Sequence, residues 1–337
     1  MYFSTVPKRY RMLRYPDMMV QFYLRNLEKF VLSKCLKRNV YLDRAKKSGK
    51  AVGRTFLSNE QFNTATQQKI ASGEPFFCCR YGNSEFTACF YALLRKNGIL
   101  DYINEKLLKT AKSGPGVFPE SEETYLQFSD SYMEALAEAD MNAYWGSVLM
   151  EEYLIDRIMK EECTQYAMRA LEPFQYEVPW TYALKGRKVL VVHPFKELIQ
   201  QQYTRRKEIF PEKEILPDFD LKVVKAIQSS GDTTPEDYQN WSEALDALYN
   251  QCMEEDFQVA LLSCGSYAVP LAGRLKAAGK QAIVVGGMLQ LMFGIKGARW
   301  EASRPDIVAM YNDAWVRAGG NYRVKNADKM VDGAAYW

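Results

Sequence analysis

Apolar runs and amphipathic segments alternate regularly in the second half of the chain. From residue 185 onwards, short apolar runs are each suited to a strand buried on both faces. Their sequences are VLVV (189–192), LKVVKAI (221–227), QVALLSC (258–264) and QAIVVGG (281–287). Helical segments are expected between them, at about 200–210, 235–255 and 266–278, with Thr234 capping the second. Strands that alternate with helices predict an α/β fold, a Rossmann-like, mostly parallel sheet flanked by helices.

The first half of the chain is less regular and is mainly helical in pattern. Ser58 or Asn59 can cap a helix that ends at Gly73. The apolar run FFCC (76–79) is suited to a buried strand, and it leads through a turn into a helix. The helical segments expected after it are 84–96, 101–112, 121–140 and 150–171.

The composition is that of an ordinary globular protein, with 47% hydrophobic and 25% charged residues. Seven scattered cysteines form no CxxC or Cys/His cluster, so we expect a reducing, cytosolic compartment. Adjacent Cys78 and Cys79 point to opposite faces of their strand and are expected to be core residues. No apolar run approaches the roughly 18–20 residues that span a bilayer.

The net charge of +3 conceals a strongly basic beginning. Residues 1–54 contain 14 Lys and Arg against 3 Asp and Glu, which gives +11 there and −8 in the remainder. Within 19–36 apolar residues recur at helical spacing, with Lys and Arg on the other face. Such a helix either lies on an anionic membrane surface or packs on the main domain. We therefore divide the chain into a basic amphipathic extension (1–57) and a Rossmann-like domain (58–337). Nucleic acid is not indicated, because no matching motif accompanies the charge.

The most unusual residues follow directly on predicted strands. In open parallel sheets, ligands bind beyond the carboxyl ends of the strands. Four such ends carry polar or glycine-rich sequence, namely RYGNSE (80–85), HPF (193–195), CGSY (264–267) and GGM (286–288). Because these ends meet at one edge of the sheet, they predict a single binding crevice.

The RYGNSE turn suggests phosphate and metal chemistry. Asn83 and Glu85, two residues apart, can direct oxygen atoms toward Mg²⁺ or Mn²⁺. Arg80 can make a forked contact to a diphosphate, and Gly82 leaves the backbone bare. The alternative is helix capping, with Asn83 as the N-cap and Glu85 in the first turn.

The other strand ends offer further candidates. Gly265 allows close backbone approach, and Ser266 and Tyr267 follow it at a helix N-terminus that suits a phosphate. The segment is neither G-x-G-x-x-G nor a Walker loop. Gly287 lies at the fourth strand end. His193 is the only histidine, and it can act as general base, contact phosphate or satisfy a backbone group.

A last segment, MLQLMFGIKGARWEAS (288–303), combines glycines, cations and Trp300-Glu301. Trp300 can stack on a sugar or base, and Glu301 can serve as a base or second carboxylate. The apolar residues in this segment are expected in the core; they are Leu289, Leu291, Met292 and Phe293.

RYGNSE after a buried strand resembles the R-F-G-D-G-E turn of bacterial glycosyltransferases with the GT-D-type fold. Arg80 and Gly82 match that motif, and Asn83 and Glu85 take the places of its two acids. The resemblance covers about 58–310 and implies a divalent metal, Mn²⁺ or Mg²⁺, and a nucleotide-sugar donor as co-substrate. Asn83 replaces an aspartate, so the metal is in question, and Arg80 alone can neutralise phosphate.

The resemblance implies a glycosyltransferase that moves a sugar to a glycan or lipid-linked acceptor in surface polysaccharide or glycoconjugate assembly. Arg80, Gly82, Gly265, Ser266, Tyr267 and Gly287 would contact the donor, and His193 or Glu301 would be the catalytic base. A cytoplasmic enzyme, peripheral at the inner face of the membrane, suits residues 1–50. The alternatives are another Rossmann-like transferase, such as a methyltransferase, and a non-catalytic nucleotide-sugar-binding or scaffold protein.

Overall fold

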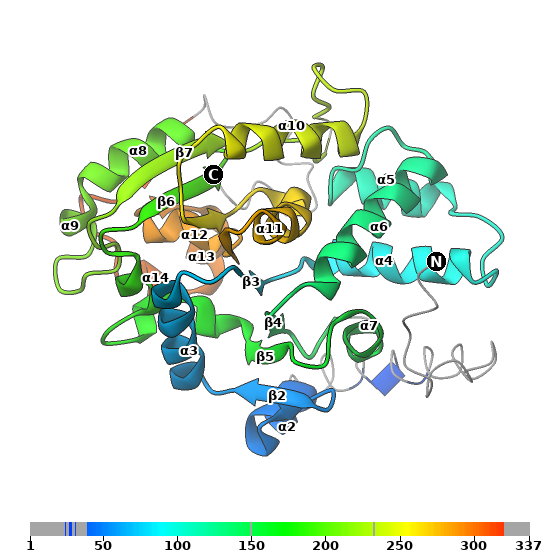
Figure 1. The fold of residues 1–337 in the computed structure, drawn as a ribbon, viewed down its shortest axis with the longest axis horizontal. Helices are drawn as coiled ribbons and strands as arrows, with labels where there is room; N and C mark the ends of the chain where they lie inside the picture. Colours follow the sequence, from blue (N-terminus) through cyan, green and yellow to red (C-terminus); the bar gives the residue numbers. More distant parts are fainter. Residues whose placement is uncertain are drawn as a thin grey trace.

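A nine-stranded sheet forms the centre of the protein (Figure 1). The computed structural model describes Leu24, Leu27, Glu28, Val31 and residues 39–148, 150–231 and 233–319. The strands are β1 (Lys50–Ala51), β2 (Arg54–Leu57), β3 (Phe76–Cys79), β4 (Met141–Tyr144), β5 (Thr164–Ala167), β6 (Lys188–His193), β7 (Asp220–Lys225), β8 (Val259–Leu262) and β9 (Gln281–Val284). Their order is β1-β2-β5-β4-β3-β9-β8-β6-β7, and every neighbouring pair is parallel except β1 with β2.

Helices cover both faces of the sheet. The helices are α2 (Val40–Ser48), α3 (Asn59–Ser72), α4 (Asn83–Lys96), α5 (Glu105–Ser113), α6 (Glu122–Ala137), α7 (Glu151–Ile158), α8 (Lys196–Thr204), α9 (Arg206–Ile209), α10 (Trp241–Met253), α11 (Ala268–Ala277), α12 (Met288–Met292), α13 (Ala298–Ser303) and α14 (Pro305–Val308). One apolar core lies under α4, α6, α7, α10 and α11, and a second lies under α3, α8 and α12. A small parallel pair, β10 (Ile295–Lys296) and β11 (Val316–Arg317), stands apart from the main sheet.

Successive strand residues feed the two cores alternately. Cys79 lies in the first core and Cys78 in the second, and both are fully buried. Burial raises the pKa of the Cys78 thiol to about 12, so it stays protonated and behaves as a small apolar side chain. The expected α/β class and the core role of both cysteines are confirmed.

Most of the predicted elements are present. Ser58 and Gln61 form a reciprocal capping box at the start of α3, and Gly73 ends it at φ 73°. The predicted core residues of the 288–303 segment are also buried.

Two helix predictions are wrong. Residues 150–171 form α7, then β5, then a short 3-10 helix, rather than one long helix. Helix α10 begins at Trp241 with Asn240 as its N-cap, not after Thr234. The Thr234 hydroxyl instead accepts a hydrogen bond from Lys112 Nζ at 2.9 Å, which ties this loop to α5.

The basic beginning of the chain merges into the sheet. β2 pairs with β5, and Ala45 of α2 reaches the first core. Arg54 is buried and donates to Met159 O at 2.7 Å. The division between 57 and 58 therefore does not mark an edge of the fold. Most of the amphipathic helix expected at 19–36 lies outside the described residues.

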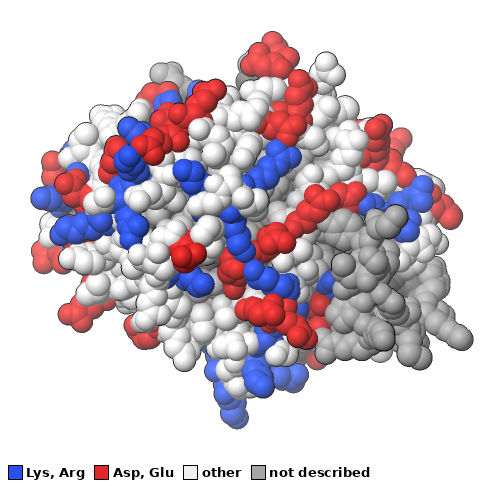
Figure 2. All heavy atoms as spheres, in the orientation of Figure 1, with Lys and Arg blue, Asp and Glu red and all other residues white. Residues whose placement is uncertain are grey.

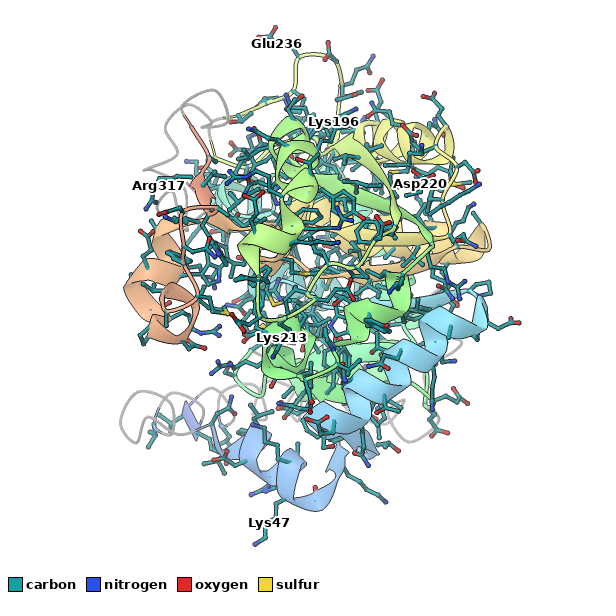
Figure 3. The ribbon with its side chains drawn as sticks, turned by 90° about the vertical axis from the view of Figure 1, so that its left-hand side faces the viewer. Lys47, Lys196, Lys213, Asp220, Glu236 and Arg317 are labelled. Carbon is teal, nitrogen blue, oxygen red and sulfur yellow. The ribbon has the colours of Figure 1, made fainter. Side chains whose placement is uncertain are left out.

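The charges on the surface are mixed. Positive and negative side chains are interspersed on the face in Figure 2, and basic ones gather at its lower end over α2. Lys47 of α2 points away from the body, and Glu236 marks the tip of the loop between β7 and α10 (Figure 3). Within the described part of the chain, no helix combines the length and apolarity needed to cross a bilayer.

A candidate ligand cleft at the carboxyl ends of the strands

A cleft of about 470 Å³ opens at the carboxyl edge of the sheet. The cleft lies beyond the ends of β3, β9, β8 and β6, which are neighbours in that order in the sheet. Ligands bind beyond the carboxyl ends of the strands in open parallel sheets. The cleft is lined by all four strand-end segments, including Arg80, Gly82, Asn83, Glu85, His193, Gly265, Ser266, Tyr267 and Gly287. The structure thus brings together the predicted site residues except Trp300 and Glu301.

The RYGNSE turn is built around the carboxylate of Glu85. Gly82 is the N-cap of α4 but has no side chain to cap with, and Asn83 is the exposed first helical residue. The capping role considered for Asn83 is therefore wrong. A Cβ atom at Gly82 would lie 2.0 Å from Glu85 Oε2. The Glu85 carboxylate folds back over Gly82 at the helix N-terminus, in the space that a side chain at this position would enter.

Arg80 is fixed by its neighbour strand. The β3–β9 register pairs Phe76 with Gln281 and Cys78 with Ile283, which brings Arg80 beside Val285. Its Nη1 atom donates to Val285 O at 3.4 Å, and its guanidinium carbon lies 6.0 Å from the Trp145 ring centroid. The arginine is partly exposed and lines the cleft. It is a cation held in place at the edge of the sheet.

A buried carboxylate supports this turn from below. Glu151, at the start of α7, accepts hydrogen bonds from the Tyr81 hydroxyl and from Trp145 N at 2.6 Å. The Tyr81 ring stacks on Phe86 with centroids 3.9 Å apart. Glu151 and Tyr81 are almost completely buried. One carboxylate therefore links the turn after β3 to the turn after β4, and both turns line the cleft.

The wall after β8 is held by aromatic residues. Ser266 Oγ accepts from Trp241 Nε1 at 3.0 Å, and the Tyr267 ring stacks on Trp241 at 5.0 Å. The Tyr267 hydroxyl shares a 2.8 Å hydrogen bond with Ser229 Oγ. Both side chains are buried, so their hydroxyls hold the wall together. Gly265, at φ 59° with no atom near its Cβ position, offers bare backbone to the cleft.

His193 is arranged as a hydrogen-bond donor. Its Nδ1 accepts from Phe195 N at 3.0 Å, so the proton of the neutral ring lies on Nε2. The residue is 2% exposed, and burial lowers the pKa of the imidazole from 6.5 to about 3. A ring in this state is a poor proton acceptor at neutral pH. The geometry therefore favours hydrogen-bond donation to a ligand over the role of general base.

Glu301 does not reach the cleft. It pairs with Arg317 Nη2 at 2.6 Å, and it is absent from the cleft lining. Trp300 is 8% exposed and packs with Ile209 and Trp315 in a third apolar cluster. The structure therefore places both residues outside the lining of this cleft, and their expected roles stay predictions. Their neighbour Arg299, which the sequence did not single out, lines the cleft instead.

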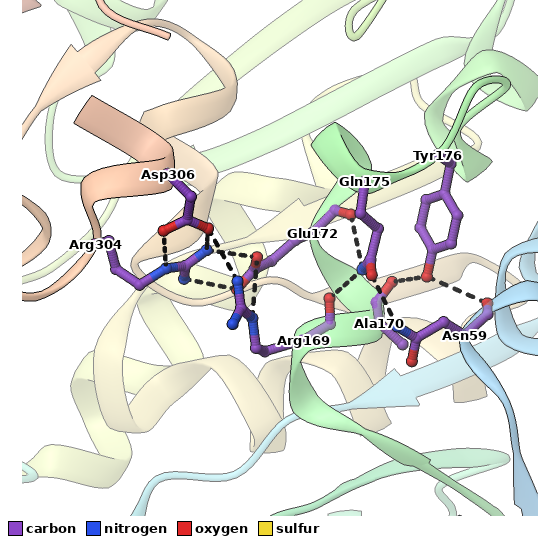
Figure 4. Close-up of polar contacts among 8 residues, drawn as sticks. All are labelled: Asn59, Arg169, Ala170, Glu172, Gln175, Tyr176, Arg304 and Asp306. Atoms are coloured by element: carbon purple, nitrogen blue, oxygen red, sulfur yellow. Dashed lines mark hydrogen bonds and ion pairs between the residues drawn. The ribbon is translucent and has the colours of Figure 1, made fainter. Parts of the chain in front are cut away.

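A network of ion pairs anchors the segment that carries Arg299 (Figure 4). Arg304 binds both oxygens of Glu172 at 2.8 Å and also Asp306, at 2.7 and 2.8 Å. Arg169 donates to Asp306 at 2.9 Å. The two-pronged contact of Arg304 with Glu172 fixes α13 and α14 against the loop after β5. Hydrogen bonds from Arg304 lower the pKa of Asp306 to about 2.

The RYGNSE turn contributes few donor atoms for a divalent cation. Among the residues described, there is no cluster of three or more His, Cys, Asp or Glu that could hold a metal ion. Asn83 contributes a neutral amide on an exposed side chain, and Glu85 is the one carboxylate lining the described cleft. Arg80 and Arg299 line the same space and repel a dication. The described cleft therefore offers the expected Mn²⁺ or Mg²⁺ a single carboxylate and places two arginine charges beside it.

Other cleft residues escaped the sequence pattern. Trp145 follows β4, a strand that was not expected, and Ser229 and Ser230 lie in the loop assigned to a helix cap. Gln290 is buried beneath the cleft. The sequence signal that could have revealed the turn after β4 was the glycine at 146, directly after Trp145. The structure confirms a turn there, with Gly146 at φ 70°.

The comparisons with known proteins are sparse. No protein-family model and no curated protein matches this chain. Two solved structures of the domain of unknown function 1792 are similar to it, each at 11% identity and over 80% of this chain and 97% of theirs. One is described as having a distinct glycosyltransferase fold and has a TM-score of 0.40; the other, selenomethionine-substituted, has 0.39. Similarity this weak transfers neither fold nor activity, and the α/β architecture rests on the strand pairing itself.

Proposed function

We propose that this protein is a glycosyltransferase that uses a nucleotide-sugar donor. The observation that carries the proposal is the position of Arg80, a cation held beside the bare backbone of Gly286 at the carboxyl edge of a parallel sheet. A guanidinium next to exposed backbone suits a diphosphate. Glu85 lies on the same cleft and supplies a carboxylate for hydroxyl chemistry. The resemblance of RYGNSE to the GT-D-type turn agrees with this assignment.

The chemistry follows from these two groups. In an inverting transfer the acceptor oxygen forms a bond to the anomeric carbon of the sugar. The bond from that carbon to the β-phosphate oxygen breaks, and the nucleoside diphosphate leaves with the electron pair. Glu85 is the only carboxylate lining the cleft among the described residues, so we assign it to take the acceptor proton. Arg80 would stabilise the charge that grows on the departing diphosphate.

The charges of the cleft weaken one alternative. S-adenosylmethionine carries a cationic sulfonium, and two arginines on one cleft disfavour such a cofactor electrostatically. A non-catalytic nucleotide-sugar-binding protein would share the phosphate contact but would not turn the donor over. Donor hydrolysis therefore separates this alternative from the enzyme.

The experiment is a donor-hydrolysis screen. The full-length protein is incubated with UDP-, GDP-, ADP- and dTDP-sugars, with and without Mn²⁺, and release of nucleoside diphosphate is measured. We expect at least one donor to be cleaved, and Glu85→Gln to lower that rate by about 100-fold or more. Glu236→Gln, at the tip of an exposed loop, is the matched control. Undiminished cleavage of every accepted donor by Glu85→Gln would contradict the assignment.

A further inference from the structure

We infer that the cleft holds its diphosphate through two arginines, Arg80 and Arg299, and without a bound divalent cation. The inference rests on the proposed function for the class of ligand, a nucleoside diphosphate or its sugar ester. It concerns how that ligand is neutralised, which can be measured by binding alone.

Arg80 supplies the fixed half of the clamp. A Cβ atom at Gly286 would lie 1.6 Å from Arg80 Nη1 and 2.8 Å from its guanidinium carbon. The guanidinium therefore fills the place of a missing side chain, with Trp145 beside it. A side chain packed in this way loses little freedom when a ligand binds, which favours affinity.

Arg299 supplies the second half from a different segment. It is exposed and lines the same cleft from α13, which follows β10. The bidentate contact of Arg304 with Glu172 holds α13 and α14 in place. Arg80 and Arg299 are the only Lys or Arg residues that line the cleft within the described ranges. Together they balance two negative charges, as a divalent cation otherwise would.

The remaining polar groups fit this assignment. Among the described residues, Glu85 is the single carboxylate lining the cleft. Its oxygen lies over Gly82 at the start of α4, where the positive end of the helix dipole stabilises its charge without a metal. We assign Glu85 to contacts with hydroxyl groups of the sugar or acceptor, which is the role given to it above.

The test is calorimetric binding of inorganic pyrophosphate and of UDP, GDP and ADP to the full-length protein. Each titration is run in EDTA and again with Mn²⁺ or Mg²⁺. We expect the tightest ligand to bind with a Kd that changes less than about threefold between the two conditions. Arg80→Lys and Arg299→Lys keep the positive charge but lose the guanidinium that can donate two parallel hydrogen bonds to a phosphate. Each should weaken binding about tenfold or more. Arg274→Lys, which is paired with Asp246 on the surface of α11, is the matched control.

The outcomes separate this inference from the proposed function. Binding that appears only with the metal overturns the arginine clamp, even if sugar transfer is then found. Metal-independent binding that both lysine variants weaken supports the clamp, even if no donor is ever cleaved. Unchanged binding in both variants, or no binding of any probe, overturns it.

Discussion

Arg80 occupies the space that a side chain at Gly286 would need. The two residues are 206 positions apart in sequence numbering, yet Arg80 Nη1 lies 1.6 Å from where a Cβ atom at Gly286 would stand. The β3–β9 register brings them together, because it pairs Cys78 with Ile283 just before both strands end. The glycine at the end of one strand therefore sets the position of the cation at the end of the next.

Gly286→Ala should displace the Arg80 guanidinium. The alanine also adopts φ of 66°, which costs about 1–2 kcal/mol of stability for a residue with a Cβ. Gly279→Ala is the matched control, because Gly279 has φ of 82° and no atom within 4 Å of its Cβ position. We expect both variants to lose similar stability in urea unfolding. Only Gly286→Ala should weaken pyrophosphate binding, by about tenfold; equal binding by both variants would contradict the relationship.

Glu151→Gln should destabilise the fold and loosen the cleft together. The carboxylate accepts from the Tyr81 hydroxyl and from Trp145 N, and its loss weakens charge-assisted hydrogen bonds in a buried place. We expect a loss of roughly 2–3 kcal/mol in the free energy of unfolding. Tyr81→Phe, which removes one of these donors, should cost about 1–2 kcal/mol. Tyr182→Phe, at an exposed tyrosine, serves as control and should cost almost nothing. Equal stability of all three variants would show that the hydrogen bonds of the buried Glu151 carboxylate do not stabilise the fold.

Two substitutions at His193 separate its nitrogen atoms. Asparagine can replace Nδ1 as acceptor for Phe195 N, whereas glutamine places a donor near Nε2. If Nε2–H contacts the ligand, His193→Gln should retain nucleotide binding and His193→Asn should lose about tenfold. Calorimetry with the ligand preferred by the wild type makes the comparison. The reverse order would assign the histidine a purely structural role at the Phe195 backbone.

The burial of His193 also predicts how the stability of the protein changes with pH. Its native pKa is about 3, below the 6.5 of the unfolded chain, because burial disfavours the charged ring. Between these values the unfolded state binds the proton and the native state does not, so stability falls as the pH falls. The slope from this group is about 1.4 kcal/mol per pH unit, or roughly 2 kcal/mol between pH 6.5 and 5.

Urea unfolding of the wild type and His193→Gln near pH 7 and pH 5 measures this contribution. Between pH 7 and pH 5, the free energy of unfolding of His193→Gln should fall by roughly 2 kcal/mol less than that of the wild type, because all other titrating groups are shared. An identical pH dependence in the two proteins would mean that the native imidazole takes up a proton as readily as the unfolded one, contrary to its buried position.

Strands β6, β8 and β9 were predictable because each lies on a run of four apolar residues. Val191 and Val192 of β6 face opposite cores, and a short continuous apolar run is typical of a strand that is buried on both faces. β4 and β5 were missed because each carries a polar residue into the interior. Asn142 donates from Nδ2 to Gln165 Oε1 at 2.8 Å, and both are fully buried. Asn142 and Gln165 each stand at the second of four strand positions and interrupt the apolar run, and the two partners lie 23 positions apart in sequence.

The candidate site was predictable in outline for a related reason. Strand ends at one edge of a sheet must converge, so Arg80, His193 and Gly265 could be grouped without coordinates. Side-chain direction could not be read in this way. Arg299 and Glu301 are two positions apart on α13, and only the structure shows that the arginine lines the cleft while the glutamate pairs with Arg317.

The basic N-terminal segment leads to a prediction about membranes. Residues 1–54 carry a net charge of +11, and Leu24 and Leu27 are each 61% exposed. Each Lys or Arg near an anionic surface contributes about 1 kcal/mol, and exposed leucines add apolar burial in the lipid. We propose that this segment docks on an anionic bilayer. The full-length protein should sediment with phosphatidylserine-containing vesicles at low salt and be released at high salt.

Substitutions test whether the exposed leucines take part in this docking. Leu24→Asp and Leu27→Asp should each reduce vesicle binding several-fold, because each removes an apolar contact and adds a negative charge. Val178→Asp, at a 52% exposed apolar residue outside the basic segment, should bind as the wild type does. Vesicles of phosphatidylcholine alone should capture little protein. Equal capture by both lipids, or equal loss in all three variants, would favour a segment that packs on its own domain with its charges in solvent.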